Sequence, residues 1–155
     1  MSAQTVKQAN TAYARVRLTA NGVDASLRID DSPAARDFLA QLPVKMTLKD
    51  YNGTEKIAYL PRKLSARGAP AGVEPCVGDV TYYAPWGNLA IFYKPFGYSE
   101  GLVTLGRIES GLDALMRLKH DVTITMERID TAPEGGDALT RGRALRSPIS
   151  TGEQR

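Results

Sequence analysis

The sequence predicts a mainly β protein, a closed or nearly closed antiparallel barrel capped by two short helices. Three observations support this class. Apolar and polar residues alternate through most of the chain, which is the period of a half-buried strand. Turn residues divide the alternating stretches into many short strands, and only two stretches change to the helical period. Closing such strands into a barrel removes exposed sheet edges, so a barrel is favoured over an open sheet.

A β-hairpin around Asn21-Gly22 begins the domain. Both positions of a two-residue hairpin turn favour positive φ, and an Asn-Gly pair adopts it readily. The residues on either side alternate with period two, and the apolar ones are Ala14, Val16, Leu18, Val23, Ala25, Leu27 and Ile29. Residues 14–29 are therefore expected to form two antiparallel strands.

A short helix should follow this hairpin. Ser32 is a favoured N-cap residue, Pro33 suits the first helical position, and Pro43 ends the run. The apolar residues in between recur at helical spacing, and they are Ala35, Phe38, Leu39 and Leu42. This helix is expected to lay one apolar face on the sheet.

The rest of the domain is expected to hold further strands, one long loop and a second helix. Strands are predicted around residues 44–48, 57–60, 79–93, 102–108 and 122–128, and the third of these stretches is a hairpin around Pro85-Trp86-Gly87. The loop 61–78 is unusually long for a small domain, and such loops are often functional. The second helix presents one apolar face, made of Leu112, Leu115 and Met116.

Length and composition fit one domain at about residues 13–130. Residues 1–12 are predicted to be a flexible leader and residues 131–155 a flexible C-terminal tail, because both lack a sustained apolar period. The 155 residues carry 20 Lys and Arg against 17 Asp and Glu without basic runs, so no nucleic-acid partner is expected. No stretch reads as a signal peptide or a membrane span, which predicts a cytoplasmic protein without a membrane partner.

Patterns for catalysis or metal binding are weak. His120 lacks a nucleophile in a triad context and is interpreted as a surface residue. Cys76, the single cysteine, cannot form an internal disulfide and has no cationic neighbour in sequence that would stabilise a thiolate. Glu74, Cys76 and Asp79 approximate the spacing of metal ligands poorly, so no metal and no other cofactor is assigned.

Aromatic residues after position 80 divide between the core and a candidate site. Tyr82 and Tyr83 must point to opposite faces of one strand. At least one of these tyrosines, together with Phe92, is therefore expected in the barrel core.

Trp86 differs because it lies in a turn, and turns lie at the rim of a barrel. With Phe96 and Tyr98 it can gather at one end of the barrel. There the rings could line an apolar ligand cleft, or they could simply plug the end. The sequence leaves both interpretations open.

Two segments resemble the cyclophilin family. "LGRIESGLDALMRL" (105–118) is similar to a cyclophilin strand ending Phe-Gly-Lys-Val with the glycine, the acidic residue and the short apolar helix that follow it. "YNGTEKIAYLP" (51–61) resembles the stretch Tyr-x-Gly-Ser/Thr-x-Phe-His-Arg-x-Ile-Pro. With the order of elements, the resemblance covers about residues 13–130. It implies an eight-stranded antiparallel barrel capped by two short helices.

The departures from the family concern its prolyl isomerase site. The catalytic arginine of cyclophilins would fall at Ala58, and an alanine cannot polarise a prolyl amide. The family's Gln-Gly-Gly-Asp segment has no counterpart, and "PFGYSEG" (95–101) replaces its Trp-Leu-Asp-Gly-x-His loop. The chain is more similar to bacterial and archaeal cyclophilin-like fold proteins, which have no established biochemical role and whose hallmark resembles "GDVTYYAPWGNLAIFYK" (78–94).

Three functions remain as expectations. The first is a binding module that holds a small organic molecule or an extended peptide against Tyr82, Trp86, Phe92, Phe96, Tyr98 and Arg62. The second is an enzyme, either a residual prolyl isomerase with Arg62 or Lys63 as its cation, or another isomerase or cyclase in the same cleft. The third is an oligomer contact, in which the apolar rim forms a homodimer interface.

Overall fold

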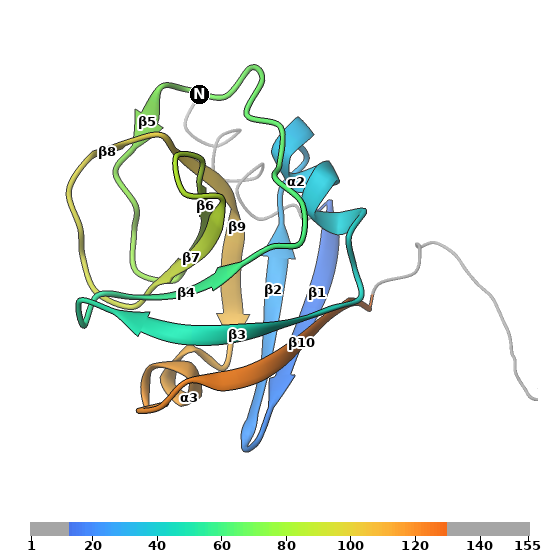
Figure 1. Cartoon of the computed structure of the whole chain (residues 1–155), viewed down its shortest axis with the longest axis vertical. Coiled ribbons are helices and arrows are strands. Elements are labelled where there is room, and N and C mark those ends of the chain that lie inside the picture. The colour runs from blue at the N-terminus through green and yellow to red at the C-terminus, as the bar shows by residue number, and fades with distance from the viewer. Residues whose placement is uncertain (1–12, 130–155) are drawn as a thin grey trace, which may run out of the picture.

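The computed structural model describes residues 13–129, so the predicted leader (1–12) and tail (131–155) lie outside the described residues. The described chain forms a closed barrel of eight antiparallel strands with two short helices, which confirms the predicted fold class (Figure 1). Around the barrel the strands follow the order β1, β10, β3, β4, β7, β6, β9, β2. Their bounds are β1 (Ala14–Ala20), β2 (Val23–Ile29), β3 (Val44–Tyr51), β4 (Glu55–Tyr59), β6 (Asp79–Tyr83), β7 (Asn88–Phe92), β9 (Leu102–Ser110) and β10 (Val122–Arg128).

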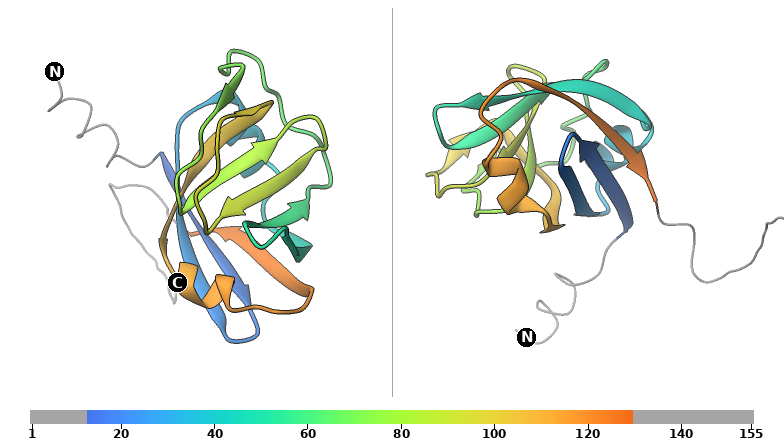
Figure 2. Two further views of the ribbon diagram at one scale, coloured as in Figure 1. Left: turned by 90° about the vertical axis from the view of Figure 1, so that its left-hand side faces the viewer. Right: turned by 90° about the horizontal axis from the view of Figure 1, so that it is seen from below.

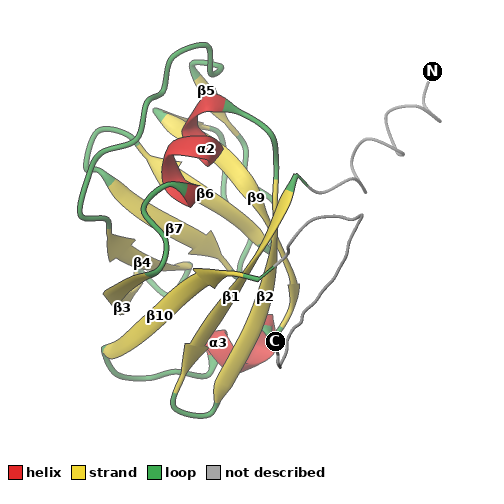
Figure 3. Ribbon diagram, turned by 90° about the vertical axis from the view of Figure 1, so that its right-hand side faces the viewer, coloured by secondary structure: helices red, strands yellow, loops and turns green. Residues whose placement is uncertain are grey.

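Two helices and a small sheet complete the described chain. Helix α2 (Pro33–Leu39) lies near one end of the barrel and α3 (Leu112–Met116) near the other (Figure 3). Strand β5 (Gly72–Val73) pairs with β8 (Ser99–Glu100) in a separate two-stranded sheet, on the side of the barrel that β6, β7 and β9 form (Figure 2). Neither helix of residues 13–129 is long and apolar enough to cross a membrane.

The opening hairpin forms as predicted, with one difference in its turn. Ala20 lies opposite Val23, so Asn21 and Gly22 make the connection. Among the described residues other than glycine, only Asn52 has a positive φ, so Asn21 does not, and Gly22 alone has a positive φ in the first turn. The expected geometry, with both residues at positive φ, occurs instead at Asn52 (56°) and Gly53 (65°), between β3 and β4.

Helix α2 begins where the sequence predicts and ends earlier than expected. The Ser32 side chain accepts a hydrogen bond of 3.2 Å from the Ala35 N–H, which satisfies one of the unpaired donors at a helix N-terminus. Phe38 is fully buried against the barrel. The helix ends at Leu39, with Ala40 as its C-cap, so Leu42 packs on the core from outside the helix.

The barrel interior is filled by side chains from all eight strands. Large members of this core, each under 2% exposed, are Tyr82, Leu18, Leu27, Ile29, Leu89, Ile91, Leu105, Ile124 and Met126. Leu115 of α3 also belongs to it, whereas Met116 is 41% exposed. The prediction that Met116 shares the apolar face was wrong, because α3 makes little more than one turn and ends at this residue.

A second, smaller apolar cluster lies on the outer face of the barrel. It consists of Ile57, Ala90, Phe92 and Leu102, with Tyr51, Val73 and Tyr83 packed against it. These residues alternate with core residues along their strands, since successive side chains of a strand point to opposite faces. The outward-pointing side chains of a barrel strand normally face solvent and are polar. The buried apolar residues on this outer face are therefore a candidate location for a functional site.

Candidate functional site

A cavity of about 220 Å³ lies over the outer apolar cluster. The turn after β3, the β6–β7 hairpin and the segment that leads into β9 surround it. The lining residues are Tyr51, Asn52, Glu55, Ile57, Tyr83, Trp86, Asn88, Phe92, Phe96, Ser99 and Leu102.

Strand register brings the floor of the cavity together from distant parts of the sequence. Tyr83 lies opposite both Asn88 on β7 and Leu102 on β9, so these three side chains lie beside one another across three strands. Four positions beyond Asn88 on β7, Phe92 lies opposite Glu55 on β4. The cavity therefore has one end near Asn88 and another near Glu55, with apolar side chains between them.

Aromatic rings form the walls. The Trp86 ring stands at 86° to the Tyr51 ring, with centroids 5.7 Å apart, and at 79° to the Tyr83 ring, with centroids 5.4 Å apart. Such edge-to-face pairs are favourable arrangements of aromatic rings. The Phe96 ring lies 5.6 Å from that of Phe92. Trp86 is still 48% exposed, so it separates the cavity from solvent and contacts both.

The hairpin turn holds Trp86 in this position. The backbone N–H groups of Trp86 and Gly87 both donate to the Tyr83 carbonyl oxygen, at 3.2 and 2.8 Å. Gly87 has φ of 76°, a conformation that favours glycine. The turn predicted around Pro85-Trp86-Gly87 is thereby confirmed.

Glu55 is the carboxyl group of the cavity. It is half-buried at the start of β4. Burial, and secondly the negative charge of Asp50, raise the pKa of Glu55 to about 7. Near neutral pH this side chain is therefore divided between its protonated and ionised forms.

Asn88 provides a buried polar group at the other end. Asn88 is 1% exposed, and its Nδ2 donates a hydrogen bond of 2.9 Å to the Leu89 carbonyl oxygen. Its Oδ1 atom has no hydrogen-bond partner among the described residues. Leaving a buried acceptor unpaired costs roughly 1–3 kcal/mol.

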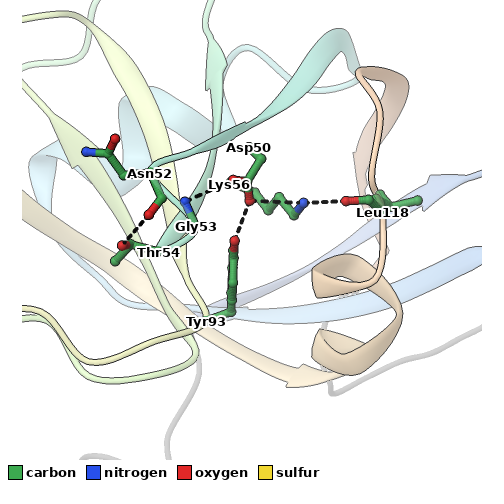
Figure 4. Close-up of polar contacts among 7 residues, drawn as sticks. All are labelled: Asp50, Asn52, Gly53, Thr54, Lys56, Tyr93 and Leu118. Carbon is green, nitrogen blue, oxygen red and sulfur yellow. Dashed lines mark hydrogen bonds and ion pairs between the residues drawn. The ribbon is translucent and has the colours of Figure 1, made fainter.

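A polar network on the inner side of the same strands fixes the charge next to Glu55. Lys56 is only 3% exposed. Its Nζ donates a hydrogen bond of 2.7 Å to the Leu118 carbonyl oxygen and lies 3.3 Å from Asp50 Oδ1 (Figure 4). The Tyr93 hydroxyl also donates to Asp50, as does the Gly53 N–H at 3.0 Å.

These contacts keep Asp50 ionised. Partial burial opposes its ionisation, but the hydrogen bonds from Tyr93, Gly53 and Lys56 outweigh burial and lower the pKa of Asp50. Burial, and then Asp50 itself, raise the pKa of Tyr93 to about 12. The cavity thus contains one carboxyl group, Glu55, and the ion pair of Asp50 with Lys56 lies on the other face of β4.

Half of the residues predicted for the site line the cavity. Trp86, Phe92 and Phe96 do so, over the outer face of the barrel and not at its end. Tyr82 does not, because it points into the core, where its hydroxyl accepts a hydrogen bond of 3.0 Å from the Leu64 N–H.

Tyr98 and Arg62 also lie outside the lining. Tyr98 is 62% exposed, and Arg62 is exposed in the loop after β4, its backbone paired with Gln41. Lys63, the other cation considered for an isomerase, is exposed in the same loop.

Ala58 lies in the barrel core, at 1% exposure, and does not face the cavity. Its outward-pointing neighbour on β4 is Ile57, which lines the cavity. An arginine at the position of Ala58 would therefore point into the barrel core and not into this cavity. The β4 residues that line the cavity are Glu55 and Ile57, and neither is an arginine.

Sequence reasoning missed Glu55, Asn88, Tyr51 and Tyr83. The predicted strand began at residue 57, which left Glu55 in a turn, whereas β4 begins at Glu55. Asn88 carried a usable signal, because it is a polar residue in an otherwise apolar strand, "NLAIF". His120 and Cys76 are exposed and away from the cavity, and residues 13–129 contain no cluster of three or more metal-ligating side chains.

Comparisons with known proteins agree with this fold. The chain is similar to the hypothetical protein AF2241 from Archaeoglobus fulgidus, whose solution structure superposes with a TM-score of 0.58 at 15% identity, over 75% of this chain and 95% of that chain. At that identity the likeness concerns the fold alone. No curated protein matches the chain. The model of the Cyclophilin-like family matches residues 18–127, more than half of the sequence and almost the whole barrel, and so the chain belongs to the Cyclophilin-like family.

Proposed function

We propose that this protein binds a small organic molecule in the cavity on the outer face of the barrel. One observation carries the proposal: Trp86 stands edge-to-face between two tyrosines above an apolar floor that also contains a buried, unpaired acceptor. An apolar pocket with a few well-placed polar groups is the usual form of a small-molecule site.

The dimensions favour a small ligand over an extended peptide. Ligand cavities commonly measure about 300–1,000 Å³, and this one, at about 220 Å³, lies just below that range. Polar groups at its two ends, Glu55 and Asn88, could orient a molecule whose middle contacts Ile57 and Phe92. Most of the binding free energy would come from apolar contact with the rings.

Prolyl isomerisation is the less favoured alternative. Cyclophilin-type catalysis needs a cation that polarises the prolyl amide. Among the described residues that line the cavity there is no arginine, lysine or histidine. Arg62 and Lys63 belong to a loop that contributes nothing to the lining, so nothing in the geometry favours their use.

Fluorescence of Trp86, the chain's single tryptophan, gives a direct test. Titration with a library of neutral, cationic and anionic small molecules should find compounds that change this fluorescence saturably. Calorimetry with the best compound should show binding at least tenfold weaker in Trp86→Ala and unchanged in Tyr98→Ala, a matched exposed aromatic outside the lining.

Two results would contradict the proposal. Absence of any saturable response across the library is the first. The second is a ligand that depends on Tyr98 but not on Trp86, because it would place binding elsewhere on the surface. Light scattering with and without ligand separates both results from formation of a homodimer through the exposed rings.

A further inference from the structure

We infer that the ligand of this cavity is an organic cation, an amine or quaternary ammonium with an apolar body. This inference rests on the proposed function and names its substrate class. It is carried by the chemistry of the lining, by the orientation of the rings and by a carboxyl group without a cationic partner.

The aromatic and ionisable side chains of the lining favour a positive charge. Within residues 13–129 it contains five aromatic rings and one carboxyl group, and it contains no arginine, lysine or histidine. The face of an aromatic ring carries partial negative charge and attracts cations, most strongly for tryptophan. The ring faces and the carboxylate would repel an anion, and a neutral molecule would gain apolar contact and hydrogen bonds without the attraction of opposite charges.

The rings also have the arrangement that cation sites use. Tyr51 and Tyr83 both stand nearly perpendicular to Trp86, and all three residues line the cavity. Stacked rings would leave a slot for a flat molecule, whereas crossed rings enclose a rounded group. A substituted ammonium is such a group, and aromatic cages are known to recognise it.

Glu55 supplies the countercharge. No ion pair between Glu55 and a described cation is formed. Its sequence neighbour Lys56 points to the other face of β4, where Asp50 and the Leu118 carbonyl oxygen hold its ammonium group. A cation in the cavity would meet a carboxyl group that has no cationic partner among the described residues, whereas the charge of Asp50 is already paired with Lys56.

The titration of Glu55 supports this geometry. Its pKa of about 7 reflects burial first and the charge of Asp50 second, and no described cation is paired with Glu55 itself. The other titratable groups of the lining are the phenols of Tyr51 and Tyr83. A bound cation would favour the ionised carboxylate, so binding below pH 7 should release a proton, and affinity should rise with pH up to about 7.

Asn88 adds a requirement at the far end. Its unpaired Oδ1 accepts hydrogen bonds and cannot donate them. Asn88 lies four positions before Phe92 on β7, and Phe92 is the strand partner of Glu55. Four positions correspond to about 13 Å along a strand. A second donor on the ligand, a hydroxyl or an N–H away from the cationic centre, would satisfy the Oδ1 atom of Asn88.

Matched pairs of cations and neutral analogues test the inference. Choline and 3,3-dimethylbutan-1-ol share shape and hydroxyl group and differ in charge. Phenylethylammonium and 2-phenylethanol share the phenylethyl group and differ in whether an ammonium or a neutral hydroxyl ends it. At pH 8 each cation should bind at least tenfold more tightly than its analogue, measured by Trp86 fluorescence and calorimetry. Lowering the pH to 5.5 should weaken the cations more than tenfold, because few Glu55 side chains remain ionised.

Glu55→Gln is the decisive variant, and Glu100→Gln is its control. Glu100 is an exposed carboxyl of β8 outside the lining. The preference for the cations and its pH dependence should disappear in Glu55→Gln and persist in Glu100→Gln. Unfolding curves of both variants show that the barrel is intact.

Three results would overturn the inference. They are neutral analogues that bind as tightly as the cations, cations that bind equally well to Glu55→Gln, and failure of every cation to bind. If neutral or anionic compounds from the library still bind through Trp86, the inference has failed while the proposed function stands. If nothing binds at all, both have failed.

Discussion

Glu55→Gln should make the folded protein more stable at neutral and alkaline pH, and the size of the gain follows from its surroundings. The pKa of Glu55 rises from 4.5 to about 7 on folding. Between these two values the folded state keeps a proton that the unfolded state has lost. Stability therefore falls as pH rises from about 4.5 to about 7, and above that it stays lowered.

A shift of about 2.5 pKa units corresponds to about 3.4 kcal/mol at 1.36 kcal/mol per unit. Glu55 is only half-buried, and solvent screening reduces this figure to about 2 kcal/mol. Glutamine keeps the shape of the protonated acid and cannot ionise. We expect nearly equal stability of the two proteins at pH 4.5, and an advantage of about 2 kcal/mol for the variant at pH 8.

Urea unfolding at pH 4.5, 6 and 8 measures this difference for wild type, Glu55→Gln and the exposed control Glu100→Gln. Other ionisable groups affect wild type and variant alike, so the difference between them isolates Glu55. An advantage that does not change with pH would refute the reasoning, because it would mean that ionisation of Glu55 costs the fold nothing.

Three further substitutions test the remaining parts of the structure. Asp50→Ala should destabilise the barrel by about 3 kcal/mol in urea unfolding, because it leaves the buried ammonium group of Lys56 without its countercharge. Tyr82→Phe should cost about 1–2 kcal/mol and leave ligand affinity unchanged, and a loss of affinity would show that this tyrosine belongs to the site. Gly106→Ala should cost about 3 kcal/mol or more, since the added methyl group would overlap the backbone oxygen of Arg28 across the β2–β9 pair, and a variant of normal stability would contradict that packing.

The fold could be predicted because its signals are local. Alternation in residues 14–29 and the Asn21-Gly22 turn define the first hairpin, and Ser32 and Pro33 begin α2. The turn conformations were less predictable. Asn-Gly occurs twice, and only the pair at Asn52 has both residues at positive φ.

The site could be predicted only in part, because alternation tells which residues share a face and not which face is inside. Tyr82 and Tyr83 were correctly separated, yet the one chosen for the site is the one in the core. The same ambiguity applies to Ala58, whose place on the inner face no motif in the sequence reveals. Glu55 falls outside the predicted strand, which begins at residue 57, whereas β4 begins at Glu55.

Contacts between side chains far apart in the sequence could not be predicted from local patterns. The Trp86 ring contacts that of Tyr51, which lies 35 positions earlier in the sequence. The contact forms because β4 pairs with β3 on one side and with β7 on the other, which brings the end of β3 close to the β6–β7 turn. Such features arise from closure of the barrel and have no local pattern.

Closure of the barrel also sets the order of events during synthesis. Strand β1 pairs with β10 along Val16–Thr19, so one of its edges stays open until residues 122–128 have left the ribosome. Strand β3 waits for the same partner. A nascent chain that pauses before β10 therefore exposes two unpaired edges, which are templates for aggregation. Pairing of β10 with β1 and β3 removes both of these edges at once.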